Sequence, residues 1–222
     1  MDEFAQFFSG EETPKVLITS SRRASKKSEA FCEEVSDIFP NCQYVKRPVS
    51  HLIKDVIRDA LEMQFTHVIV ISENQKLPET LIMTKLPEGP TAYFHLTSIK
   101  SGKDIYKHGR SSAHNPELIL NNFTTRLGHT IGRFFVSLFP PVPQFHGRQV
   151  VTLHNQRDFI FFRRHRYIFD DQGQRVTLQE IGPRFTMKLE ALQKGTFNRQ
   201  SGEFELSHKA ADQAARKRSF IL

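Results

Sequence analysis

Cysteine is scarce in this sequence, and its placement excludes the fold and site classes that depend on it. The 222 residues contain two cysteines, Cys32 and Cys42, which are separated by nine residues. That spacing fits neither a disulfide framework nor a Cys-x-x-Cys metal site. The histidines are scattered, without a His-Glu-x-x-His motif or a mixed Cys/His ligand set. We therefore expect no zinc site and no cofactor.

Long hydrophobic runs are also absent. A membrane-spanning helix needs roughly 20 consecutive apolar residues, and the longest runs here are far shorter. The first residues, Met1 to Glu3, are acidic where a secretory signal is basic. With a mean hydropathy of -0.43 and 38% hydrophobic residues, the sequence is typical of an intracellular globular protein without a membrane partner.

Two features that phosphate-processing enzymes need are missing. The loop after the first expected strand, Ser20 to Arg23, lies where α/β folds bind phosphate groups, but it contains no glycine. Without a glycine-rich loop, the backbone cannot approach a nucleotide closely. Two-metal nucleases need several carboxylates close together, whereas the adjacent Asp170 and Asp171 of a turn point apart. The sequence therefore disfavours a nuclease or nucleotide hydrolase and predicts a protein that is not an enzyme.

Positive charge is present in excess, and it is distributed unevenly. The net charge is +7; residues 1–110 hold fifteen Lys/Arg and fifteen Asp/Glu, whereas residues 111–222 hold sixteen and nine. The whole excess thus lies in the second half. Because Lys and Arg that contact phosphates release condensed counterions, such a one-sided balance favours a nucleic-acid partner.

The spacing of apolar residues predicts an α/β fold. In the first half, strands are expected at residues 15–19, 43–45, 67–71, 81–83 and 92–96, and helices at 31–39 and 52–61. Residues 1–13 are expected to form a loose arm that docks through its phenylalanines. A polar linker is predicted at 98–115. A long helix is predicted from Pro116 to Leu138, in which Gly128 and Gly132 indicate that another backbone packs closely.

A basic ribbon follows this helix. Strand patterns occur at residues 148–154, 159–169, 176–178 and 184–189. Alternation places Phe159, Phe161 and Arg163 on one face and Ile160, Phe162 and Arg164 on the other. The aromatic residues can be sheet core or an exposed surface, and the arginines can be a solvated face or a phosphate-binding one. The predicted RNA contacts on the helix and ribbon are Arg126, Arg133, Arg157, Arg163, Arg164, Arg166, Arg184 and Lys188.

Three motifs resemble those of the Brix-domain family of ribosome-assembly factors. They are NNFTTRLGH at 121–129, HNQRDFIFFR at 154–163 and GPRFT at 182–186. The resemblance implies an α/β (α+β) fold of two pseudo-symmetric halves, each similar to the anticodon-binding domain of class II aminoacyl-tRNA synthetases. It places a Brix domain at residues 14–206, with halves at 14–100 and 112–206, between an arm at 1–13 and a basic tail at 207–222. Because the GPRFT segment is compared with a nucleic-acid-binding motif, Arg184 and Lys188 are expected contacts.

The same resemblance implies a function. It is that of a nucleolar, non-enzymatic factor that binds pre-rRNA during assembly and rRNA maturation of the large (60S) ribosomal subunit, alongside a dedicated protein partner. Recognition is expected to rest on phosphates and shape, with aromatic residues stacking on unpaired bases. An alternative stays open, in which the neutral first half and its phenylalanines dock the partner and the chain is a protein-interaction scaffold with little RNA affinity.

Overall fold

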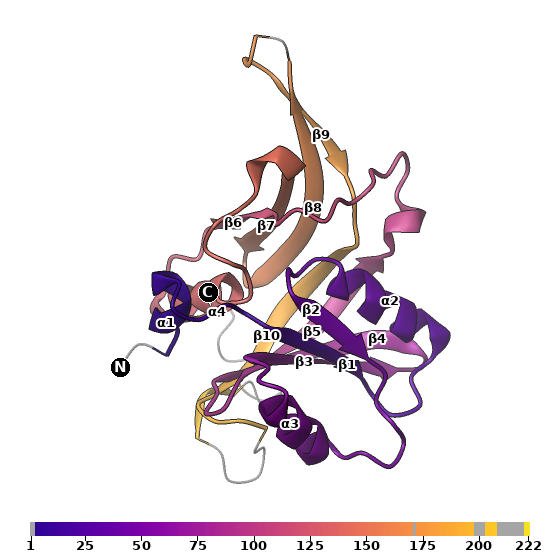
Figure 1. The fold of residues 1–222 in the computed structure, drawn as a ribbon, viewed down its shortest axis with the longest axis vertical. Helices are drawn as coiled ribbons and strands as arrows, with labels where there is room; N and C mark the ends of the chain where they lie inside the picture. Colours follow the sequence, from indigo (N-terminus) through magenta and orange to yellow (C-terminus); the bar gives the residue numbers. More distant parts are fainter. Residues whose placement is uncertain (1–2, 171, 198–202, 208–219) are drawn as a thin grey trace.

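The computed structural model describes residues 3–170, 172–197, 203–207 and 220–222, which form one continuous sheet with helices on both faces (Figure 1). The strands are β1 Val16–Ser20, β2 Cys42–Val45, β3 His67–Asn74, β4 Leu77–Lys85, β5 Thr91–Lys100, β6 Glu117–Asn121, β7 Gln149–Gln156, β8 Phe159–Phe169, β9 Val176–Glu180, β10 Arg184–Gln193 and β11 Phe204–Ser207. The α-helices are α1 Ala5–Ser9, α2 Lys26–Ser36, α3 Ile53–Glu62 and α4 Arg126–Val136. Short 3₁₀ turns lie at Gly102–Asp104 and Phe145–Gly147.

One strand pattern occurs twice in this sheet. In the first occurrence β1 is parallel to β3, and β3, β4 and β5 form an antiparallel series. In the second, β6 is parallel to β7, and β7, β8 and β10 form the matching series. The two series meet where β5 pairs with β10, so the order is β2-β1-β3-β4-β5-β10-β8-β7-β6. β9 pairs with β8, and β11 with β10.

The main core lies on one face of the sheet, beneath α2 and α4. α2 begins at Ser25, whose side chain accepts a hydrogen bond from the Ser28 N–H, and α4 begins at Thr125, which caps Gly128 in the same way. Phe31 of α2 and Phe134 of α4 are among the buried residues of this core. Both helices therefore pack on the same side of the sheet.

The opposite face is covered by α3, and only in the first half of the sheet. Val56 and Ala60 of α3 pack with Val68 and Val70 of β3 in a second, smaller core. Between β1 and β3 the chain inserts α2, β2 and α3, whereas between β6 and β7 it inserts α4 alone as α-helix. Among the described residues, no helix equivalent to α3 covers β7, β8 and β10 on this side, and their surface stays open.

The prediction of a long helix beginning at Pro116 is wrong for the first part of that segment. Residues Glu117–Asn121 form β6, and α4 starts only at Arg126. The helical spacing of Leu120 and Phe123 misled the prediction because both side chains pack against Gly132 of α4 from outside that helix. The close approach predicted at Gly128 is confirmed, since an added Cβ there would lie 2.9 Å from the backbone carbonyl carbon of Leu222.

The predicted loose arm is also corrected. Phe4 and Phe7 are 2% and 3% exposed, and their rings pack on Phe134 and His67 at centroid distances of 5.4 and 5.0 Å. These rings are therefore part of the core and do not dock a partner protein. The start of the predicted 98–115 linker lies inside β5, and most of the predicted basic tail, residues 208–219, lies outside the described residues.

Cys32 and Cys42 are free thiols, and burial raises the pKa of each to about 12. Within the described part of the chain, no helix is long and apolar enough to cross a membrane. That part also holds no group of three or more His, Cys, Asp or Glu side chains placed to bind a metal ion.

Candidate nucleic-acid interface

The uncovered side of β7, β8 and β10, with the adjoining His95 of β5, is the candidate interface, and we call it the open face. Residues that oppose each other across antiparallel strands point to the same side, so the strand register defines its members. One row runs from His154 through Phe161 to Thr186, and the next from Gln156 through Phe159 and Lys188 to His95. The open face comprises these residues together with Thr152 and its partner Arg163: His95, Thr152, His154, Gln156, Phe159, Phe161, Arg163, Thr186 and Lys188.

Aromatic rings and cations alternate on this surface. The Lys188 Nζ lies 5.6 Å from the centroid of the Phe159 ring, and the Arg163 Cζ lies 5.8 Å from that of Phe161. Phe159 is 39% exposed, whereas Phe161, Arg163 and Lys188 are half-buried. Cations held over aromatic rings gain stability while their charged groups stay accessible. The open face therefore offers both positive charge and ring surface to a ligand.

Arg163 is held in place by the sheet. One of its terminal nitrogens donates to the carbonyl oxygens of Phe162 and Phe185, at 2.7 and 3.3 Å. Burial, together with the nearby Arg184, lowers the pKa of Arg163, but a guanidinium stays charged at neutral pH. Neither Arg163 nor Lys188 forms an ion pair with a carboxylate among the described residues.

Arg164 is not a surface residue, and its prediction as an RNA contact is wrong. It is 3% exposed and donates to the Gln149 side chain at 2.9 Å, while its Nε has no hydrogen-bond partner among the described residues. Burial lowers its pKa. Strand alternation turned Arg164 toward the core side, so a run of arginines along β8 divides between two faces.

The GPRFT motif is explained by packing. Gly182 has a φ of +81°, and an added Cβ would lie 2.6 Å from the Cα of Gly102. Phe185 stacks on Phe162 with ring centroids 4.4 Å apart, and the Arg184 guanidinium forms a two-bond ion pair with Glu180. Because the guanidinium of Arg184 is already paired with the Glu180 carboxylate, it is less available to a phosphate than the ammonium group of Lys188.

The remaining candidate arginines are not members of the open face. Arg126 and Arg133 belong to α4, on the core side of the sheet; Arg133 sits over the Phe8 ring at 4.4 Å and Arg126 lies 3.9 Å from Glu205. Arg157 is exposed in the β7–β8 turn, and Arg166 is exposed near the far end of β8. The eight predicted residues therefore do not form one surface. Arg163, Lys188 and the paired Arg184 lie together on β8 and β10, and Arg157 lies in the turn beside Gln156.

Two members of the open face, His95 and His154, were missed by the sequence reasoning. His154 opposes Phe161, and His95 opposes Lys188. Both are half-buried; His154 lies at the end of the first strand pattern of the basic ribbon, and His95 lies in a strand outside it. The predicted hairpin could have placed His154 opposite Phe161 across a short turn, whereas the position of His95 depends on the register between strands far apart in sequence.

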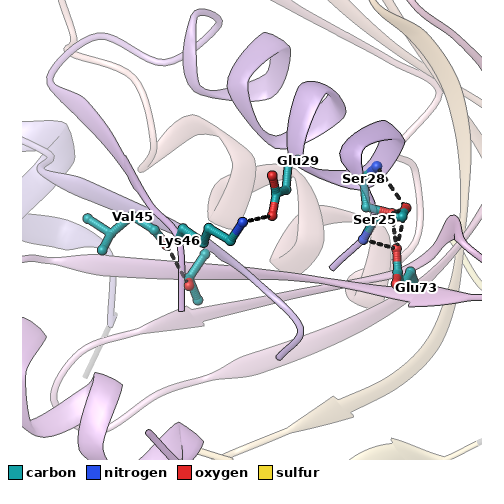
Figure 2. A network of polar contacts seen from close by, with 7 residues as sticks. Ser25, Ser28, Glu29, Val45, Lys46 and Glu73 are labelled. Atoms are coloured by element: carbon teal, nitrogen blue, oxygen red, sulfur yellow. Dashed lines mark hydrogen bonds and ion pairs between the residues drawn. The ribbon is translucent and has the colours of Figure 1, made fainter. Parts of the chain in front are cut away.

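The position after β1, where α/β folds bind phosphate, is occupied by a carboxylate of the protein itself. Glu73 of β3 accepts hydrogen bonds at the start of α2 from the Ser28 hydroxyl at 2.5 Å and from the Ser25 hydroxyl and N–H at 2.7 and 2.9 Å (Figure 2). These bonds, led by that of Ser28, lower the pKa of Glu73. A carboxylate at a helix N-terminus occupies the place a phosphate would take.

Comparison with known proteins defines the class of protein to which this fold and surface belong. A family model described as the Brix domain matches residues 21–191. The chain belongs to the Brix-domain family.

Particular relatives extend this assignment. The chain is 49% identical over its whole length to proteins named ribosome production factor 1 from Pongo abelii and Mus musculus, and it spans 63% of the length of each. A relative of the same name from Danio rerio is 47% identical, with 67% of its length spanned. The crystal structure of a probable ribosomal biogenesis protein from Aeropyrum pernix K1 has the same fold, with a TM-score of 0.59, 14% identity, and coverage of 79% of this chain and 96% of that one.

Proposed function

We propose that this protein is a non-catalytic ribosome biogenesis factor that binds pre-rRNA through the open face during assembly and rRNA maturation of the large ribosomal subunit. The names of its relatives support a role in ribosome production. The proposal includes action in the nucleolus alongside a protein partner in pre-ribosomal particles. The observation that carries it is a sheet face without a covering helix among the described residues, on which Arg163 and Lys188 have no carboxylate ion-pair partner.

The chemistry of the open face fits RNA better than it fits an acidic protein. Arg163 is immobilised by two backbone carbonyls, so little side-chain entropy is lost when it contacts a phosphate. The neighbouring rings of Phe159 and Phe161 add surface on which bases stack. An acidic peptide would use the cations and leave the rings unused.

A protein-interaction scaffold is the second candidate function, and a different surface favours it. The β8–β9 hairpin projects from the body of the protein at the top of Figure 1. Ile168, Phe169, Val176 and Leu178 on this hairpin are 49%, 52%, 49% and 58% exposed. A concentration of exposed apolar side chains is typical of a surface that a partner covers. A stoichiometric complex that survives nuclease treatment, with no RNA affinity in the isolated chain, would favour this function over the first.

If the open face binds RNA, the affinity should depend on salt concentration, and Arg163 and Lys188 should account for part of that dependence. Replacing Arg163 and Lys188 together with alanine is expected to weaken binding of large-subunit pre-rRNA fragments and to make the plot of log K against log salt concentration shallower by about 1.4, because two phosphate contacts are lost from a single strand. Fluorescence anisotropy across a salt series measures both quantities.

The matched control removes the same charges from α3. Lys54 and Arg58 are exposed on that helix, so Lys54→Ala combined with Arg58→Ala lowers the net charge equally without touching the open face. An equal change of slope in both double variants would contradict the proposed location, and an affinity that does not vary with salt would contradict phosphate binding altogether.

A further inference from the structure

The two phenylalanines of the open face are placed at a spacing that separates neighbouring bases. Phe159 and Phe161 are two residues apart on β8 and point to the same side. Two residues of an antiparallel strand span about 6.8 Å, which is about twice the 3.4 Å rise between stacked nucleotides. Bases lying on these two rings would therefore be unstacked from each other, as they are in an extended single strand.

Each ring has its own cation. Lys188 directly opposes Phe159 across the β8–β10 pair, and Arg163 follows Phe161 on the same face of β8. The same pair of groups therefore occurs at two successive positions: an aromatic ring that can stack on a base and a cation that can contact a phosphate. His154 beside Phe161 and His95 beside Lys188 add ring nitrogens within the same two rows, and these nitrogens can hydrogen-bond to base edges.

Burial separates these rings from the aromatic residues that build the core. Phe162 and Phe185, on the other side of the same strands, are 3% and 2% exposed and stack on each other. Phe159 keeps 39% of its surface exposed on a face that no described helix covers. A duplex would not stack on these rings, because its base faces are hidden within the helical stack and it presents mainly phosphates and ribose hydroxyls.

We infer that the open face binds unpaired nucleotides, with two successive bases stacked on Phe159 and Phe161 and their phosphates held by Lys188 and Arg163. This inference rests on the proposed function and narrows its ligand to single-stranded RNA. Selectivity comes from ring stacking, and the cations alone would bind single strands and duplexes without this preference.

The test compares two RNA forms and two pairs of phenylalanines. The probes are a single strand of about 12 nucleotides, within the range of single-strand site sizes, and a hairpin duplex of the same composition. The test variant is Phe159→Leu with Phe161→Leu. The control variant is Phe145→Leu with Phe169→Leu, because these rings are 62% and 52% exposed but lie outside the open face. Thermal unfolding of each variant shows that the fold is retained.

The expected result is a loss specific to single strands. The test variant should bind the single strand about tenfold more weakly, within the range for lost base stacking, with its duplex affinity and the control variant unchanged. The fluorescence of 2-aminopurine in the strand should be quenched by the wild type and not by the test variant. The inference would be overturned if the wild type bound both RNA forms equally, or if the test variant bound the single strand as tightly as the wild type. In either case, salt-dependent RNA binding would still support the proposed function. No binding of either RNA would overturn both.

Discussion

Replacing Gly182 with alanine is expected to lower the free energy of unfolding by about 2–5 kcal/mol. Part of this cost, about 1–2 kcal/mol, arises because the φ of +81° at Gly182 is a left-handed conformation that alanine tolerates poorly. A further cost of about 1–3 kcal/mol arises because the new Cβ would lie 2.6 Å from the Cα of Gly102, and this overpacking has to be relieved by backbone movement. Urea denaturation of the two proteins measures the difference.

Gly173 supplies the matched control for this substitution. Its φ of +69° is similar, but no atom lies within 4 Å of an added Cβ. Gly173→Ala should therefore show the conformational cost alone, and the difference between the two variants isolates the contact between Gly182 and the loop that follows β5. If both substitutions cost the same, the close approach of Gly102 and Gly182 is not important for stability, and our structural explanation of the GPRFT motif is wrong.

Stability is expected to fall as the pH decreases below 6.5, and His67 is the residue we expect to contribute most. Its side chain is completely buried, and its two ring nitrogens lie 2.8 Å from the Thr66 Oγ1 and 3.1 Å from the Ser137 Oγ. A neutral imidazole can satisfy both contacts, because one ring nitrogen donates and the other accepts. Burial first, and the charge of Lys85 second, lower the pKa of His67 to about 3.

The direction of the pH effect follows from this pKa. The unfolded chain protonates His67 near its ordinary pKa of 6.5, whereas the folded protein keeps it neutral to about 3. Between these pH values, the unfolded state binds one more proton than the folded state. The contribution of His67 to the free energy of unfolding is therefore fully present above pH 6.5. It is lost as the pH falls, by up to about 1.4 kcal/mol per pH unit. Between pH 6.5 and about pH 4.5, the expected loss is roughly 2–3 kcal/mol.

A non-titrating residue at this position tests the assignment. His67→Gln is expected to be less stable near neutral pH, because the ring packing with Phe7 and Phe134 is lost, but its stability should vary less with pH over the same interval. Glu73 does not confound the comparison, since it titrates alike in both proteins. Urea denaturation at a series of pH values measures the two slopes, and identical slopes would show that the pH dependence originates elsewhere.

The strands could be predicted from sequence because their signals are local. The continuous apolar run at residues 67–71 and the alternation along 159–169 correspond to β3 and β8. The start of α4 could not be predicted in this way, because Leu120 and Phe123 contact the same core from a strand and a loop at spacings that imitate a helix. Phe4 and Phe7 were likewise assigned to a loose arm, since only tertiary structure reveals the core that buries them.

The candidate interface was predictable in its chemistry and less so in its composition. The basic, aromatic character of β8 is visible in the sequence, and alternation correctly placed Phe159, Phe161 and Arg163 together. The sequence does not reveal which face a helix covers, so it did not separate the buried Arg164 from the accessible Arg163. The contribution of His95 depends on pairing between β5 and β10, which are distant in the chain, whereas that of His154 follows from the β7–β8 hairpin.

The most direct test of RNA binding at the open face is ultraviolet crosslinking of the protein to large-subunit pre-rRNA fragments, followed by mass spectrometry of the crosslinked peptides. We expect the crosslinks to concentrate in β7, β8 and β10, with Phe159 and Phe161 among the modified residues. Crosslinks confined to α2, α3 or α4, which lie outside the open face, would contradict the account.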